Sequence, residues 1–138
     1  MIHFIAGGKG EGKTKRMIAM ANAQLGTTDG HLVFIDDDKR HIFDLHYNIR
    51  FVMAGSDLLQ SHAEFIGFIM GILSQNNDIK TIYIDGLTNI LSDTLTNDDL
   101  DDFATRLQSC SEQNDVDFVV CINRKKEDLP PSIHALLI

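Results

Sequence analysis

The sequence predicts an α/β fold in which a mainly parallel sheet is covered by helices on both faces. Short, uniformly apolar runs recur along the chain, and such runs are typical of strands that are buried on both faces. Segments with helical spacing or helix-capping residues separate these runs, which is the alternation that parallel strands need for their crossovers. The chain has 138 residues, 43% of them hydrophobic, and this size suits one domain over residues 1–138.

The first half of the chain predicts three strands and one helix. A strand is expected over residues 2–6, and a second one over residues 31–35, after the turn-forming residues 26–30. Residues 49–53 are expected to form a short third strand. Between the first two strands, apolar residues recur at about every 3.6 positions and predict a helix; they are Met17, Ile18, Ala21 and Leu25.

In the second half, two capping boxes mark the starts of helices. Ser61 followed by Glu64 predicts a helix to about residue 73, and Thr96 followed by Asp99 predicts one to about residue 113. Right-handed crossovers would bring the carboxyl ends of all strands to one edge of the sheet, where ligands of α/β proteins bind. The remaining two strands are expected over residues 81–84 and 118–122. Gly67 and Gly71 in the first of these helices predict a close contact with the sheet.

The most specific signal lies between the first strand and the first helix. Residues 7–14 read Gly-Gly-Lys-Gly-Glu-Gly-Lys-Thr, which fits the phosphate-binding pattern G-x-x-x-x-G-K-[ST] in the strand–loop–helix context that it requires. Glycines let consecutive N–H groups turn towards an anion, and the helix presents its positive end to the same anion. The alternative is an ordinary glycine-rich turn. We predict a nucleotide site whose contacts are Gly7, Gly8, Lys9, Gly10, Glu11, Gly12, Lys13, Thr14 and Lys15.

A metal ion is expected beside this loop. In such loops the lysine, here Lys13, reaches the β- and γ-phosphates, and the hydroxyl of Thr14 ligates Mg²⁺. Asp85 ends a predicted strand and is the expected carboxylate on the same ion, because Mg²⁺ is commonly held by one or two carboxylates together with substrate phosphates. The alternative for Asp85 is a turn residue that accepts local N–H groups.

With these motifs in place, the chain resembles the RecA-like branch of P-loop NTPases. The run Phe-Ile-Asp-Asp-Asp at residues 34–38 is similar to that family's Phe-Ile-Asp-x-Glu, which puts Asp38 at the position of the catalytic base. Ile84-Asp85-Gly86 is similar to its metal-site strand, and Asn123 follows a strand as its γ-phosphate sensor does. The chain also resembles small stand-alone bacterial ATP-binding proteins that are sometimes labelled twitching-motility ATPases. The resemblance implies a three-layer P-loop NTPase fold, ATP and Mg²⁺ as ligands, and catalytic roles for Lys13 and Asp38.

Departures from the family pattern leave the activity open. Asp38 is one methylene shorter than the usual glutamate, and Gly86 stands where an acid often follows the metal aspartate. Asp38 could instead belong to an acidic loop in which Asp36 or Asp37 tunes the Mg²⁺ shell, while Arg124 could touch the γ-phosphate or be solvated. We expect a slow or partner-activated ATPase. The alternative is a non-hydrolysing ATP-dependent regulatory module; a small-molecule kinase is less favoured, since no Arg-rich lid segment is evident.

The composition of the chain limits the classes of molecule that it is expected to bind. A formal net charge of −8 argues against general nucleic-acid binding, and no apolar run approaches the ~20 residues of a membrane span. Cys110 and Cys121 lack C-x-x-C spacing and are expected to be core thiols in the cytoplasm, and six dispersed histidines do not predict a zinc site. ATP is the expected ligand, and a homo-oligomer or a protein partner remains open. Residues 40–50 could form a loop near the nucleotide, an adenine-stacking surface or a subunit contact.

Overall fold

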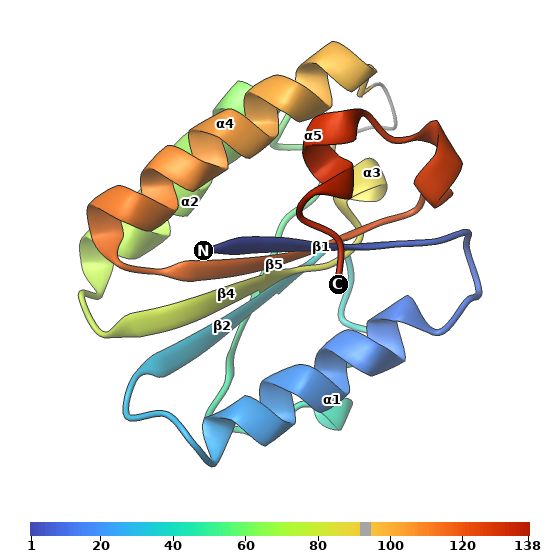
Figure 1. Ribbon diagram of the computed structural model, residues 1–138. Coiled ribbons are helices and arrows are strands. Elements are labelled where there is room, and N and C mark those ends of the chain that lie inside the picture. Colours follow the sequence, from blue (N-terminus) through green and yellow to red (C-terminus); the bar gives the residue numbers. More distant parts are fainter. Residues whose placement is uncertain (92–94) are drawn as a thin grey trace.

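Five parallel strands form the central sheet of the computed structural model, which describes residues 1–91 and 95–138 (Figure 1). Their order across the sheet is β1-β5-β4-β2-β3, so β5 lies between β1 and β4 although it comes last in the chain. The strands are β1 (Ile2–Ala6), β2 (His31–Asp36), β3 (Arg50–Met53), β4 (Ile79–Ile84) and β5 (Asp117–Ile122). The predicted parallel sheet is therefore confirmed.

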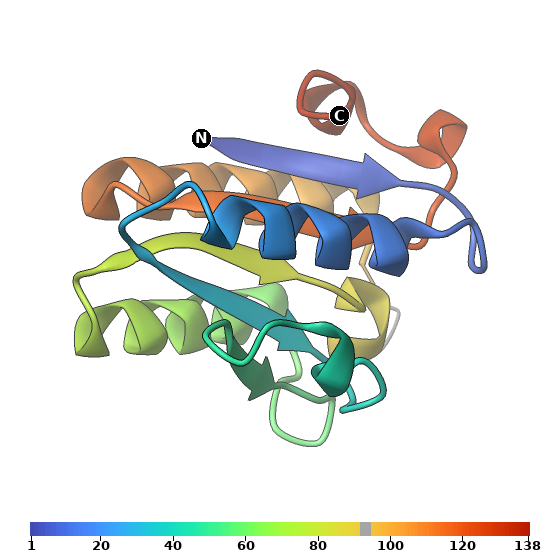
Figure 2. The same ribbon diagram turned by 90° about the horizontal axis from the view of Figure 1, so that it is seen from below.

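Helices cover both faces of this sheet. Helix α1 (Lys13–Leu25) lies on one face, and α2 (His62–Gln75) and α4 (Asn97–Asn114) lie together on the other, as the two views show (Figures 1 and 2). The described residues also contain short elements that the sequence did not predict; they are α3 (Leu87–Ile90), α5 (Pro131–His134), and the 3₁₀ turns Ile42–Asp44 and Lys126–Asp128. None of the helices in the two described ranges has the length and apolar character needed to cross a membrane.

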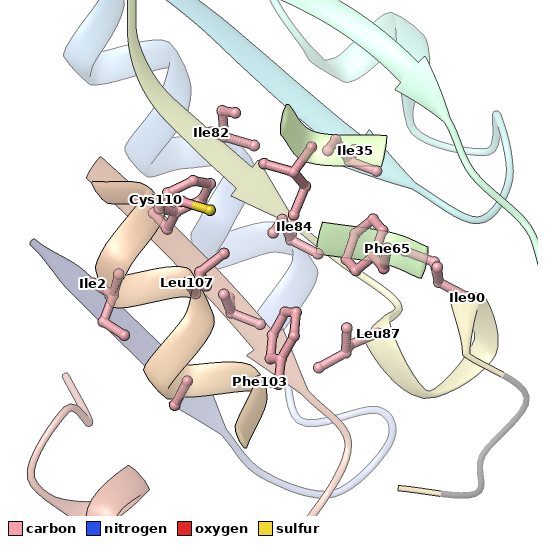
Figure 3. Close-up of a cluster of buried hydrophobic side chains, with 14 of the residues drawn as sticks. Ile2, Ile35, Phe65, Ile82, Ile84, Leu87, Ile90, Phe103, Leu107 and Cys110 are labelled. Carbon is pink, nitrogen blue, oxygen red and sulfur yellow. The ribbon is translucent and has the colours of Figure 1, made fainter. Parts of the chain in front are cut away.

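The alternation of side chains along each strand fills two cores. In β1, Phe4 packs into the cluster beneath α2 and α4, whereas its neighbour Ile5 packs against α1. In β4, Ile82 and Ile84 face the first cluster, which Figure 3 shows, and Tyr83 faces the second. Because neighbouring residues of a strand point to opposite faces, a strand that is covered on both sides is apolar throughout.

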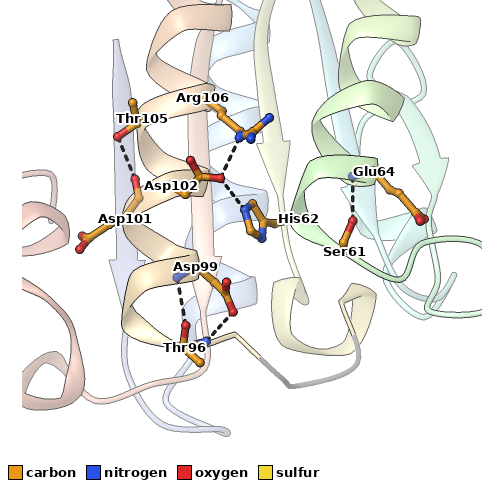
Figure 4. Close-up of polar contacts among 9 residues, drawn as sticks. All are labelled: Ser61, His62, Glu64, Thr96, Asp99, Asp101, Asp102, Thr105 and Arg106. Atoms are coloured by element: carbon orange, nitrogen blue, oxygen red, sulfur yellow. Dashed lines mark hydrogen bonds and ion pairs between the residues drawn. The ribbon is translucent and has the colours of Figure 1, made fainter.

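Local capping explains where the two long helices of the second half begin. Thr96 Oγ1 accepts from Asp99 N at 3.1 Å, and Thr96 N donates to the Asp99 carboxylate at 3.0 Å, so this capping box is complete (Figure 4). Ser61 Oγ accepts from Glu64 N at 3.1 Å, but the Glu64 carboxylate accepts from Gln60 N instead of Ser61 N. Both helices begin one residue after the predicted cap.

A carboxylate on α4 links the two helices of this face. Asp102 Oδ2 accepts from Arg106 Nε at 2.7 Å and lies 2.7 Å from His62 Nε2 on α2 (Figure 4). The hydrogen bond with His62 lowers the pKa of Asp102 most, and the hydrogen bond with Arg106 lowers it further. The contact joins α2 to α4 on the side away from α1.

The predicted contact of Gly67 and Gly71 with the sheet is wrong. Both glycines are exposed, and a Cβ atom built on either would have no neighbour within 4 Å. The buried stripe of α2 consists instead of Phe65, Ile69 and Leu73, which are spaced four residues apart. Positions 67 and 71 lie two residues from this stripe and therefore face outwards.

Candidate functional site

The carboxyl ends of the strands meet at a cavity of about 370 Å³. The loop after β1, the residues after β2, the end of β4 and the end of β5 all contribute to its lining. Of the predicted site residues, Gly7, Gly8 and Glu11 do not line it. Those that do are Lys9, Gly10, Gly12, Lys13, Thr14, Lys15, Asp38, Asp85 and Asn123.

The loop between β1 and α1 requires glycine at two positions that line the cavity. Gly10 has a φ of 84° and Gly12, the N-cap residue of α1, has a φ of 80°. These left-handed angles are readily adopted by glycine and are strained for most other residues. Gly7 N donates to Arg124 O at 2.8 Å, which attaches the start of the loop to the end of β5.

Lys13 supplies a buried cation to the cavity. Its ammonium donates to Gly8 O at 2.5 Å, which folds the side chain back over the loop. An ammonium carries three donors. The other donors of the Lys13 ammonium can bind an anion in the cavity, and hydrogen bonds between two charged groups are stronger than those between neutral groups.

A hydroxyl and a carboxylate face each other beside Lys13. Thr14 Oγ1 donates to Asp85 Oδ2 at 2.7 Å. The other carboxylate oxygen of Asp85 accepts from Gly86 N at 2.9 Å, and Asp85 N donates to Ile35 O at 2.8 Å, so strand pairing orients this aspartate. Oxygen donors of these two kinds fit Mg²⁺, which needs few protein ligands when phosphates supply others. Across the described residues, no group of three or more His, Cys, Asp or Glu could hold a metal ion by itself.

Asp36 is more deeply buried than the other carboxyl groups that line the cavity. It is 4% exposed, and its Oδ1 accepts from Asp37 N at 2.7 Å. Burial raises the pKa of Asp36 to about 8, helped by a hydrogen bond with the Asp37 side chain and by the charge of Asp85. The sequence offered Asp36 or Asp37 only as a group that tunes the Mg²⁺ shell, because the strand sequence does not show how deeply the end of the strand is buried.

Asp38 is held by Arg40 at the rim of the cavity. Its Oδ1 accepts from Arg40 N at 2.8 Å and its Oδ2 from Arg40 Nη2 at 2.6 Å. The hydrogen bond from the Arg40 backbone lowers the pKa of Asp38 most, and the hydrogen bond from its side chain lowers it further. Asp38 therefore lines the cavity as predicted, but each of its carboxylate oxygens already accepts a hydrogen bond.

Arg124 is half-buried and its side chain lies outside the cavity, which gives no support to a contact with the γ-phosphate. Its guanidinium donates to Leu95 O and its carbonyl accepts from Gly7 N. Arg124 thus connects the loop after β1 to the segment that precedes α4. Asn123, its neighbour, does line the cavity.

Residues 40–50 form an ordered connection that packs on α1. Asn22 on α1 donates to Asp44 O at 3.0 Å and accepts from His46 N at 2.9 Å. Phe43 and Tyr47 are 97% and 88% exposed and do not line the cavity, so the cavity offers no support for adenine stacking by either ring. Arg40 and His41 do line it, so the start of this segment lies beside the cavity, in agreement with the first of the three alternatives for residues 40–50.

The cavity joins cationic and anionic groups in one space. Lys9, Lys13 and Lys15 come from the loop side, and three consecutive aspartates at positions 36–38 come with Asp85 from the other strand ends. An anion that carries a divalent cation matches both sets of charges. Neither the models of known protein families nor the curated protein sequences contain a match to this chain.

Proposed function

We propose that this chain is a RecA-like P-loop protein that binds Mg-ATP in the cavity and hydrolyses it slowly or on activation by a partner. One observation carries the proposal: the glycine loop and the Thr14–Asp85 pair share a single cavity with Asn123. The glycine loop is a specific signal by itself, whereas the Thr14–Asp85 pair and Asn123 are weak signals alone. Together they supply donors for phosphates, oxygen ligands for Mg²⁺ and a polar group at the end of the intervening strand.

The roles of the residues follow from their chemistry. The loop N–H groups and Lys13 would hold the β- and γ-phosphates, with Lys9 and Lys15 adding positive charge at the cavity wall. Thr14 and Asp85 would hold Mg²⁺, which neutralises charge on the phosphates when it is bound. Asn123 would contact the γ-phosphate, because β5 lies between the loop strand β1 and the aspartate strand β4.

A non-hydrolysing ATP-dependent module is the second candidate. It is favoured by the ion pair between Arg40 and Asp38, because a carboxylate engaged in this way is poorly placed to accept a proton from water. In this function, ATP would order the residues after β2 for a protein partner. We also propose a cytoplasmic location, since Cys110 and Cys121 are both free and buried.

Calorimetric titration with Mg-ATP tests the binding site. Lys13→Ala should weaken affinity by about tenfold or more, because it removes charge-assisted hydrogen bonds worth about 1.5–3 kcal/mol each. Lys80→Ala is the matched control, since Lys80 is exposed near the amino end of β4. Equal affinity of Lys13→Ala and the unmodified protein would refute the site. Phosphate release, measured over a wide range of protein concentration, then separates the two candidates and reveals any dependence on neighbouring copies.

A further inference from the structure

The place of a side chain after Asp85 is filled by a carboxylate from another strand. Gly86 has no side chain, and a Cβ atom built on it would lie 2.5 Å from Asp37 Oδ1 and 3.2 Å from Asp36 Oδ1. Asp37 follows β2, whereas Gly86 follows β4. Although no acidic residue follows Asp85 in the sequence, the carboxylate of Asp37 occupies this part of the cavity.

Strand pairing fixes this arrangement. β2 and β4 are parallel neighbours, with Ile35 opposite Ile84, and Asp85 N donates to Ile35 O at 2.8 Å. The first residues beyond the two strands are consequently held side by side. Gly86 has a φ of 68° and leaves the space that the Asp37 carboxylate occupies.

The two neighbours of Asp37 are less available to a ligand. Each oxygen of Asp38 accepts a hydrogen bond from Arg40, and Asp36 is buried with its Oδ1 accepting from Asp37 N. Asp37 is half-buried and lines the cavity, where its side chain also hydrogen-bonds to the side chain of Asp36. Of the three consecutive aspartates, Asp37 thus combines access to the cavity with a position against the strand end that carries Asp85.

We propose that Asp37 is the catalytic carboxylate that orients the attacking water and accepts its proton, an inference that rests on the proposed ATP hydrolysis. The water oxygen forms a bond to the γ-phosphorus while the bond between that phosphorus and the β–γ bridging oxygen breaks. The bridging oxygen keeps the electron pair and leaves with ADP. The proton of the water passes to the Asp37 carboxylate, which later releases it to solvent, and inorganic phosphate is the second product.

Asp37→Asn tests this role because it keeps the shape of the side chain and removes its basicity. Phosphate release from Mg-ATP should fall by about a hundredfold or more, the usual contribution of a positioned general base, while ATP affinity stays close to that of the unmodified protein. Asp29→Asn is the matched control, since Asp29 is exposed and precedes β2 at the opposite edge of the sheet. Asp38→Asn should cause a smaller loss than Asp37→Asn.

Gly86→Ala provides a second, independent perturbation. Its added methyl would meet Asp37 Oδ1 at 2.5 Å and displace the carboxylate, so phosphate release should fall. Because the φ of 68° at this position also strains an alanine, ATP affinity is measured on the same variant, and the fall in release should exceed any fall in affinity. Thermal unfolding of each variant shows whether it remains folded.

The outcomes separate this inference from the proposed function. Release by Asp37→Asn at the unmodified rate, loss of ATP affinity in Asp37→Asn, or a larger loss of release in Asp38→Asn would each overturn the role of Asp37. ATP binding by the unmodified protein without any phosphate release would also overturn that role but would leave the binding site intact. Failure of the unmodified protein to bind Mg-ATP would overturn the proposed function itself.

Discussion

Asp36 should make the stability of the nucleotide-free protein fall as the pH rises. The pKa of this carboxyl is raised from 3.8 to about 8, mainly by burial. Between about pH 4 and pH 8 the folded protein therefore keeps a proton on Asp36 that the unfolded chain has lost. A state that binds more protons is destabilised as protons become scarce. The contribution of Asp36 is therefore greatest below about pH 4, declines between about pH 4 and pH 8, and is constant above that.

The magnitude follows from the linkage relation. One pKa unit corresponds to about 1.4 kcal/mol, so the shift from 3.8 to about 8 corresponds to about 6 kcal/mol over the whole range. Asp36→Asn replaces the acid with a neutral group of the same shape whose Oδ1 can still accept from Asp37 N. This variant should lose the decline, and its advantage over the unmodified protein should grow from pH 5 to pH 8.

Urea unfolding at several pH values, with Mg²⁺ chelated and no nucleotide present, measures this difference. Subtracting the two stability curves removes the contributions of the titrating groups that do not interact with Asp36, so the difference reports Asp36 together with Asp37 and Asp85. Asp29→Asn, which changes an exposed aspartate, should give a curve parallel to that of the unmodified protein. If Asp36→Asn also gives a parallel curve, the carboxyl is ionised in the folded protein and the argument from burial is wrong.

Three further predictions concern the packing that supports the site. Thr96→Ala should cost about 0.5–2 kcal/mol in urea unfolding, because it removes the N-cap of α4. Phe103→Ala should lower the free energy of unfolding by about 3–5 kcal/mol, because this ring of α4 is fully buried in the core. Phe43→Ala, at a ring that is 97% exposed, is the control and should leave the unfolding midpoint unchanged. Cys121 should resist alkylation at neutral pH until the protein unfolds, because burial raises the pKa of its thiol; rapid alkylation of the folded protein would contradict its buried position.

Local signals explain why most of the architecture could be predicted. The strands other than the edge strand β3 are largely apolar because helices cover both faces of the sheet there. The cap at Thr96 depends only on residues within one turn of the helix. Where local signals are ambiguous, prediction was wrong. Helix α2 is apolar on several sides, so its sequence could not tell that Phe65, Ile69 and Leu73 would face the sheet and leave Gly67 outside. The short helices α3 and α5 carry too few residues for a periodic pattern.

The α/β order of elements and the glycine loop could be predicted without a structure, because apolar periodicity, helix capping and left-handed glycines depend on residues close together in the chain. The sequence also indicated that Asp85 and Asn123 would lie at the loop's edge of the sheet, since parallel strands end on the same side. The differences among the three consecutive aspartates became apparent from the folded structure. Asp36 is buried, Asp37 lies against Gly86 and Asp38 pairs with Arg40. The first two differences arise from burial and from the pairing of β2 with β4, which bring together residues far apart in the chain. The third is a local contact across two residues, which the sequence offered without specifying.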